Sequence, residues 1–168
     1  ANTCQTVTEA LGIALPNSAS CLGVSAEKLR VSEETGRKAV ELVNNDIKCL
    51  DIINRESIEN AIRVLMATGG STNLIIHLIA IARRANIDLK LDDFERISKE
   101  TPVLVNVKPH GTENVGMGFH NAGGVASLMK EMEGMLNGDC LTVTGKTISE
   151  NLKDIDMPYD TNTIRPLD

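Results

Sequence analysis

The residues best suited to chemistry form a run of glycines and small polar residues between two apolar segments. The run is Gly69, Gly70, Ser71, Thr72 and Asn73. Glycine lets a ligand or another backbone approach closely, and a helix that begins here would direct its free N–H groups and its dipole at an anion. The alternative is a tight turn between two helices, with Ser71 or Thr72 as the N-cap. Residue types alone leave both interpretations open.

A second motif, Gly145-Lys146-Thr147, resembles the end of a phosphate-binding P-loop. That motif needs an earlier glycine at a fixed spacing, where this chain has Cys140. We therefore interpret Thr147 as a helix cap and Lys146 as a solvated side chain, and expect no nucleotide site here.

Histidines and cysteines show no metal-ligand spacing. We expect His77, within an apolar segment, to be a hydrogen-bonded core residue, whereas His110 and His120, in glycine-rich stretches, are better candidates for a site. The cysteines are far apart and form no CxxC pair, so we expect reduced thiols that mostly pack as small apolar groups. They are Cys4, Cys21, Cys49 and Cys140.

Composition is typical of a globular protein with an aliphatic core. The chain has 168 residues, 42% apolar and 24% charged, with no Trp, one Tyr and two Phe. This length suits one domain or a large part of one. The net charge of −6 argues against nucleic acid as a partner, because phosphate binding requires a basic face. No apolar run reaches bilayer length and no signal-like start is present, so we expect a cytoplasmic protein. Both ends suggest a piece of a longer chain.

Apolar periodicity predicts helices alternating with fewer strands. The segment 71–85 is apolar nearly all round, which is typical of a buried helix. Gly123-Gly124 would cost about 1 kcal/mol per glycine inside a helix, so we expect a loop-to-helix junction there. The expected helices are 3–11, 26–44, 55–66, 71–85, a short one started by Asp92 and Glu95, 119–135 and a short one after Thr147; the expected strands are 103–107 and 140–144. This order favours an α/β fold with an incomplete parallel or mixed sheet.

The order of several short motifs resembles a known family. The motifs are ANT, TEALG, RESIENAI, ATGGSTN, IIHL, LDDFERIS, TPVL, AGGV, LMKE and GDCLTVTGKT. Together they are similar to the dihydroxy-acid dehydratase and sugar-acid dehydratase family, which includes phosphogluconate dehydratase. The resemblance covers nearly all of residues 1–167, in order and at consistent spacing. It implies that residues 1–153 are part of a helix-rich, three-layer α/β/α N-terminal domain and that 154–168 link it to a C-terminal domain.

The resemblance also implies an activity. Members of the family remove water from a 2,3-dihydroxy carboxylic acid to give a 2-keto acid, with branched-chain amino-acid biosynthesis as the expected setting and a sugar acid as the alternative substrate. An iron–sulfur cluster polarises the departing hydroxyl, Mg²⁺ holds the substrate, and a serine acts as the base. The segments that carry these groups in the family are not in this chain, so we expect the segment alone to be inactive and to bind no metal itself.

Within this chain the resemblance indicates two groups of site residues. Asn2 and Thr3 continue the family's cysteine turn and are expected near the cluster, and Gly69 to Asn73 are expected to face the substrate. The expected partners are a dihydroxy acid, the rest of the same polypeptide and a second copy in a dimer, with no nucleic acid or membrane. A hypothesis from another class is a stand-alone, non-catalytic domain that binds a small anion or a protein.

Overall fold

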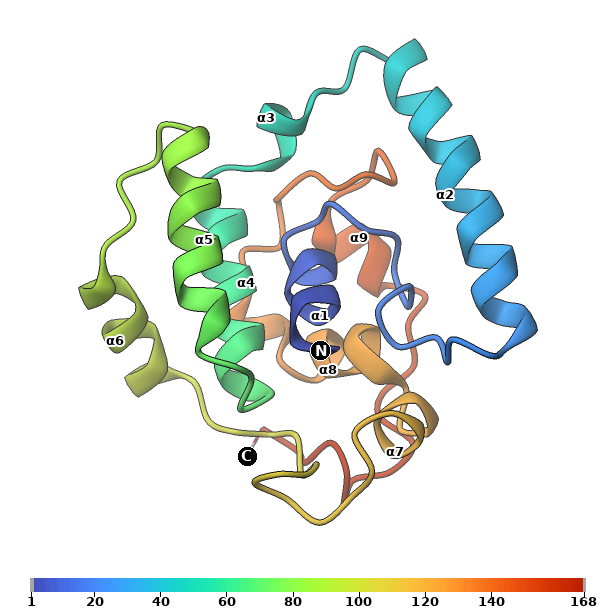
Figure 1. The fold of residues 1–168 in the computed structure, drawn as a ribbon, viewed down its shortest axis with the longest axis vertical. Coiled ribbons are helices and arrows are strands. Elements are labelled where there is room, and N and C mark those ends of the chain that lie inside the picture. Colours follow the sequence, from blue (N-terminus) through green and yellow to red (C-terminus); the bar gives the residue numbers. More distant parts are fainter. Residues whose placement is uncertain (1, 168) are drawn as a thin grey trace.

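Helix α4 (Arg55–Ala67) packs against three other helices, α1 (Asn2–Ala10), α5 (Asn73–Arg84) and α6 (Leu91–Glu100) (Figure 1). The computed structural model describes residues 2–167. Ile58 and Ile62 of α4 are buried in one apolar cluster, and Val64 and Ala67 in another. The remaining helices are α2 (Ala26–Asn44), α3 (Cys49–Ile52), α7 (Met117–Asn121), α8 (Gly124–Glu131), the 3-10 helix η1 (Glu133–Met135) and α9 (Ile148–Leu152).

The expected sheet is not confirmed in residues 2–167. The β-pairings there are isolated bridges: Val105 with Ile164, Val107 with Glu113, and Leu141 with Thr147. The segment 103–107 is extended, but the Leu104 and Val105 N–H groups both donate to the Ala67 carbonyl oxygen, at 2.9 and 3.0 Å. The β-branched pattern therefore predicted the extended backbone but not its partners, which are the end of α4 and residues 163–165.

The helix boundaries largely follow the sequence signals. Ser25 caps α2, and its Oγ accepts a hydrogen bond from the Lys28 N–H. Thr147 caps α9 as predicted, with Glu150 completing the capping box. For α6 the prediction was wrong by two residues, because the N-cap is Lys90 rather than Asp92, and Asp93 rather than Glu95 accepts from the N-cap N–H.

The predicted helix 119–135 is divided. Gly123 and Gly124 have positive φ values of 106° and 65°, so α7 ends before them and α8 begins at Gly124. The backbone there is left-handed, which glycine adopts without steric cost. This is the predicted loop-to-helix junction.

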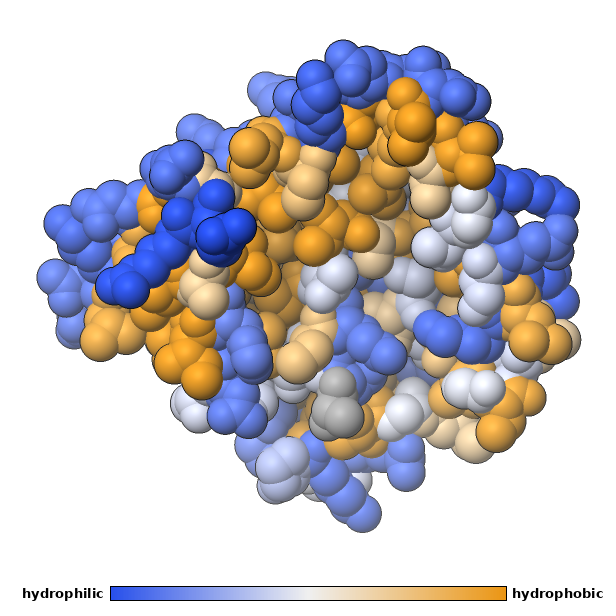
Figure 2. All heavy atoms as spheres, turned by 45° about the horizontal axis from the view of Figure 1, so that its top comes forward, coloured by the Kyte–Doolittle hydropathy of each residue, from blue (hydrophilic) through white to orange (hydrophobic). Residues whose placement is uncertain are grey.

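Helix α5 is buried on one face only, so the prediction of an all-round buried helix was wrong within the described residues. Leu74, Leu78 and Ala82 are buried, whereas Ile76 is 65% exposed. His77 is also exposed, so it is not the core residue we expected. Figure 2 shows apolar side chains gathered over one face of the molecule.

No helix among residues 2–167 combines the length and apolarity needed to cross a membrane.

Helix α2 stands apart from the rest of the fold (Figure 1). None of its residues is buried, and Leu29 and Val43 are 74% and 79% exposed.

The segment after residue 154 packs against the rest of the chain. Ile164 is fully buried, and the Arg165 N–H donates to the Leu104 carbonyl at 2.9 Å. The division of the chain into a domain and a linker at residue 154 stays a prediction.

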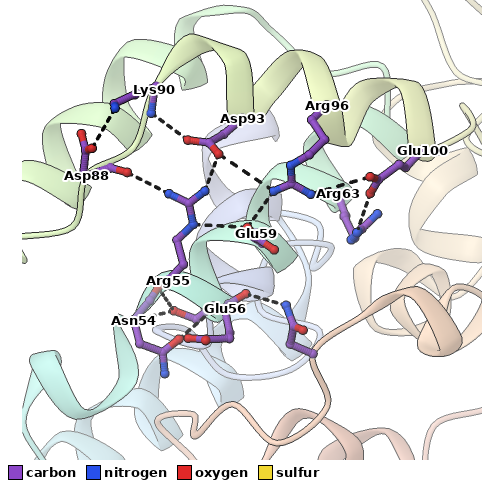
Figure 3. Close-up of polar contacts among 12 residues, drawn as sticks. Asn54, Arg55, Glu56, Glu59, Arg63, Asp88, Lys90, Asp93, Arg96 and Glu100 are labelled. Atoms are coloured by element: carbon purple, nitrogen blue, oxygen red, sulfur yellow. Dashed lines mark hydrogen bonds and ion pairs between the residues drawn. The ribbon is translucent and has the colours of Figure 1, made fainter.

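Polar side chains fix α6 against α4 (Figure 3). The Arg55 guanidinium contacts the Asp93 carboxylate, the Glu59 carboxylate at 3.2 Å and the Asp88 carbonyl at 2.8 Å. Arg96 reaches Glu59 from α6 at 2.8 Å. Burial by itself would raise the pKa of Asp93, but the Lys90 N–H and the neighbouring guanidinium groups outweigh it and lower that pKa.

Glu9 of α1 holds the loop that follows the helix. Its side chain is buried, and its two oxygens accept hydrogen bonds from the Asn17 N–H at 2.8 Å and the Ala19 N–H at 3.0 Å. Burial raises the pKa of Glu9 to about 7, although the two N–H groups act in the opposite direction. The carboxyl group thus couples α1 to residues 17–19.

The connection from α4 to α5 is a Schellman turn, against which α1 packs. Gly69 has φ +55°, and its N–H donates to the Met66 carbonyl, while the Gly70 N–H donates to the Leu65 carbonyl, both at 3.0 Å. A Cβ on Gly70 would lie only 2.5 Å from Thr3 Cγ2. The missing side chain therefore allows the start of α1 to rest on the turn.

We predict that Glu9→Gln destabilises the fold at pH 5 by about 1–3 kcal/mol, because an amide NH₂ cannot accept from the second buried N–H. The loss should be smaller at pH 8. With a folded pKa raised above 4.5 to about 7, the stability that Glu9 contributes is complete below pH 4.5 and declines as the pH rises through 7. Urea unfolding at both pH values measures the difference. The control is Glu95→Gln at an exposed site of α6; a Glu9→Gln loss independent of pH would contradict the raised pKa.

We predict that Gly70→Ala lowers the free energy of unfolding by about 1–3 kcal/mol, through overpacking against Thr3 and Leu65. Adding Thr3→Ser should recover part of the loss, because it removes the methyl group nearest to the new Cβ. The control is Gly36→Ala in α2, where a Cβ meets nothing within 4 Å and should be neutral or slightly stabilising. Equal effects of Gly70→Ala and Gly36→Ala in thermal unfolding would show that α1 does not pack on the turn.

Candidate functional site

A cleft of about 460 Å³ opens where the start of α1, the α4–α5 turn and the segment 105–110 meet. Each of these three parts is fixed by a contact already described: Thr3 on Gly70, the Schellman bonds of the turn, and the Val105 N–H on the Ala67 carbonyl. The residues that line the cleft are Asn2, Thr3, Thr6, Thr68, Gly69, Gly70, Ser71, Val105, Val107, Lys108, Pro109, His110, Val115 and Phe119.

Most of the site residues suggested by the sequence come together in this cleft. Asn2 and Thr3 lie on one side, and the Ser71 N–H points at Thr3 Oγ1 at 3.4 Å. Gly69 and Gly70 lie between them and the segment 105–110. Thr72 and Asn73 are not part of the lining; they are exposed residues at the start of α5.

Gly69 and Gly70 therefore terminate helix α4. The sequence left open a helix start that faces a ligand and a plain turn, and the Schellman bonds of Gly69 and Gly70 give the turn. Thr72 occupies the N-cap position of α5 but makes no side-chain cap bond, whereas Ser71 Oγ accepts from the Asn73 N–H at 3.4 Å. The same residues still border the cleft, so the two interpretations are compatible.

His110 lies directly over Gly69. A Cβ on Gly69 would be 2.6 Å from His110 Cε1, so only glycine leaves room for the imidazole. His110 Nε2 is 2.9 Å from the Val105 carbonyl oxygen. The glycine-rich surroundings had already suggested His110 as a candidate, and the structure places it in the cleft.

Lys108 was missed by sequence reasoning. A single lysine before a proline in a loop has no pattern that separates it from a solvated surface residue. Its backbone N–H donates to the Glu113 carbonyl at 2.9 Å, and the Gly111 N–H closes the loop on the Val107 carbonyl at 2.7 Å. These bonds bring Lys108 to the rim, and the lining contains no carboxylate beside it.

The other chemical candidates lie elsewhere. His120 borders a separate polar pocket, 3.7 Å from Glu27. Burial raises the pKa of the Cys140 thiol to about 11 and also raises that of Cys21, so neither is an activated nucleophile. Cys4 and Cys49 are exposed and unbridged. Lys146 lies next to the α9 cap, away from the cleft lining.

The donor set does not fit an iron–sulfur cluster or Mg²⁺ held by these residues alone. A cluster requires thiolates, and Mg²⁺ prefers carboxylate oxygens. The cleft lining contains neither, and residues 2–167 include no group of three or more His, Cys, Asp or Glu that could hold a metal. The chemistry that the cleft can provide is binding, through one ammonium, one imidazole, several hydroxyls and an apolar wall.

Known proteins match the chain along its whole length. The family described as dihydroxy-acid/6-phosphogluconate dehydratase, N-terminal, matches residues 1–151. A dihydroxy-acid dehydratase of Polynucleobacter asymbioticus is 48% identical over 172 aligned residues, and that of Polaromonas naphthalenivorans is 46% identical; both alignments cover 100% of this chain. One from Albidiferax ferrireducens is 46% identical over 99% of this chain.

The chain spans about 30% of the length of these relatives. The family match covers far more than half of its residues. The chain therefore belongs to the dihydroxy-acid/6-phosphogluconate dehydratase family, of whose N-terminal region it is a part.

Proposed function

We propose that this chain is the part of a hydro-lyase that helps to bind a 2,3-dihydroxy carboxylic acid during its conversion to a 2-keto acid. In this reaction a proton leaves C2 and the hydroxyl leaves C3, together forming water, and the resulting enol tautomerises to the ketone. The observation that carries the proposal is the match of the whole chain to proteins named dihydroxy-acid dehydratase.

The cleft supports a small hydroxy acid as the substrate. Its polar side offers hydroxyls from Thr3 and Ser71, and its other side is formed by Val105, Val107 and Phe119. An apolar wall suits the alkyl end of a short branched acid, in keeping with branched-chain amino-acid biosynthesis. A phosphorylated sugar acid would bring several negative charges to a lining with one lysine, so we keep the sugar-acid dehydratase as the second candidate. A stand-alone anion- or protein-binding domain is the third.

We further propose that the cluster and Mg²⁺ act in the longer protein and are held by residues other than those described, with Asn2 and Thr3 beside the cluster. The extended segment 103–107 would then join strands of an α/β/α domain, and the exposed face of α5 would be covered in a cytoplasmic dimer. The isolated chain should form no 2-keto acid.

A chimera tests the function. This chain replaces the matching segment of the Polynucleobacter asymbioticus dihydroxy-acid dehydratase, with which it is 48% identical. We expect the chimera to convert a branched 2,3-dihydroxy acid to its 2-keto acid, with kcat/KM reduced by less than about 100-fold, and the isolated chain to show no turnover. The unaltered relative is the positive control.

A folded chimera with an intact metal centre but no turnover of dihydroxy or sugar acids would overturn the proposal. Turnover of a sugar acid only would select the second candidate. Product formation by the isolated chain would contradict its inactivity.

A further inference from the structure

We propose that helix α2 is a docking surface for a second copy of this chain, with the two α2 helices paired antiparallel along the face that carries Leu29, Gly36, Val40 and Val43. The pairing does not depend on the proposed dehydratase activity, and it uses a different surface from the exposed face of α5. Figure 1 shows α2 at the edge of the molecule, apart from the other helices, so a second helix has access to it.

The outer face of α2 carries an apolar stripe. Leu29, Val40 and Val43 are 74%, 61% and 79% exposed. With about 3.6 residues per turn, these positions and Gly36 fall on one side of the helix, and the half-buried Val31 falls on the other. The stripe therefore points away from the rest of its own chain, where a second copy can reach it.

Gly36 lies in the middle of this stripe, and no neighbour within its own chain requires a glycine there. A Cβ at position 36 would meet no atom within 4 Å. Glycine inside a helix is less favourable than alanine, because its backbone loses more conformational freedom on folding. A second helix that crosses closely at this point would account for the glycine, because the missing side chain lets the two backbones approach.

A row of charges beside the stripe makes α2 complementary to its own reverse. The signs alternate along the row, which consists of Arg30, Glu33, Arg37 and Glu41. In an antiparallel pair centred next to Gly36, Arg30 of one copy lies at the level of Glu41 of the other, and Glu33 at the level of Arg37. A parallel pair would instead bring like charges together.

These side chains are available to a second copy. The ion pair between Arg37 and Glu33 of one chain leaves both side chains 66% exposed. Helix α2 has 19 residues and is therefore about 28 Å long. Its pairing gives a smaller interface than those of stable dimers, so we expect a Kd on the order of 10–100 µM for the 168-residue chain.

Two charge variants of the 168-residue chain test the pairing by sedimentation equilibrium. The acidic variant carries Arg30→Glu and Arg37→Glu, and the basic variant carries Glu33→Arg and Glu41→Arg. Each variant alone should associate at least about tenfold more weakly than the unaltered chain, because like charges then face each other. The equimolar mixture should associate at least as tightly as the unaltered chain, and added salt should weaken it.

A control and a neutral variant separate the interface from net charge and from folding. Lys99→Glu with Lys146→Glu changes the net charge as much as the acidic variant does, at exposed positions outside α2, and should associate like the unaltered chain. Gly36→Ala changes no charge and is tolerated within a single chain, but it should weaken the pair about threefold or more, because its Cβ lies where the helices cross.

Intermolecular NOEs in a mixture of labelled and unlabelled chains give the orientation. The Leu29 methyl groups of one copy should show NOEs to the Val43 methyl groups of the other. Within one chain these residues are 14 positions apart, about 21 Å along the helix, so the signal cannot arise from a single chain.

Several outcomes would overturn the pairing. An unaltered chain that stays monomeric up to about 1 mM, well above the Kd expected for so small an interface, would leave α2 to another occupant, such as the rest of a longer polypeptide. A mixture of the charge variants no tighter than each variant alone, or NOEs from Leu29 to Leu29, would exclude the antiparallel register. Association that is lost in Ile76→Glu on α5, but kept in Gly36→Ala and in both charge variants, would place the contact on α5 instead. No turnover is measured, so these results are separate from the chimera assay.

Discussion

The absence of two side chains at the end of α4 is the constraint on which the cleft depends. Gly69 and Gly70 close the helix with a Schellman turn, and each leaves space for a different neighbour. Thr3 rests on Gly70, which brings the start of α1 to the turn, and the His110 ring rests on Gly69, which brings in the loop after residue 105. A Cβ on Gly70 would displace Thr3, and a Cβ on Gly69 would displace the His110 ring. The same two glycines are therefore needed for the turn and for the assembly of the cleft.

The sequence predicted helices far better than it predicted their partners. Capping signals such as Ser25 and Thr147 are local and were confirmed, because a cap depends on residues within one turn. The segment 103–107 was predicted as a strand on its β-branched residues. Two of its N–H groups donate to the Ala67 carbonyl, and other hydrogen bonds connect it to residues 163–165, partners that no local pattern reveals. Likewise, six of the suggested site residues converge on the cleft, whereas Lys108 was missed because it is recognisable only from what surrounds it.

Faces of α5 and α2 remain apolar and exposed. Ile76 of α5 is 65% exposed although Leu78 on the same helix is buried, and Val43 of α2, a helix without buried residues, is 79% exposed. The chain spans about 30% of its relatives, and the periodicity of α5 was that of a helix buried all round. Residues 2–167 bury one face of α5 only, through Leu74, Leu78 and Ala82.

Proton–proton NOEs in the folded chain test the central claim most directly. If the glycine turn assembles the cleft, the Thr3 methyl group will show NOEs to the α-protons of Gly70, and the His110 ring proton Hε1 will show NOEs to those of Gly69. Both contacts connect segments far apart in the sequence, so neither can arise from local structure. A Thr3 methyl that shows NOEs only within α1, in a chain whose α4 and α6 contacts are intact, would contradict the account.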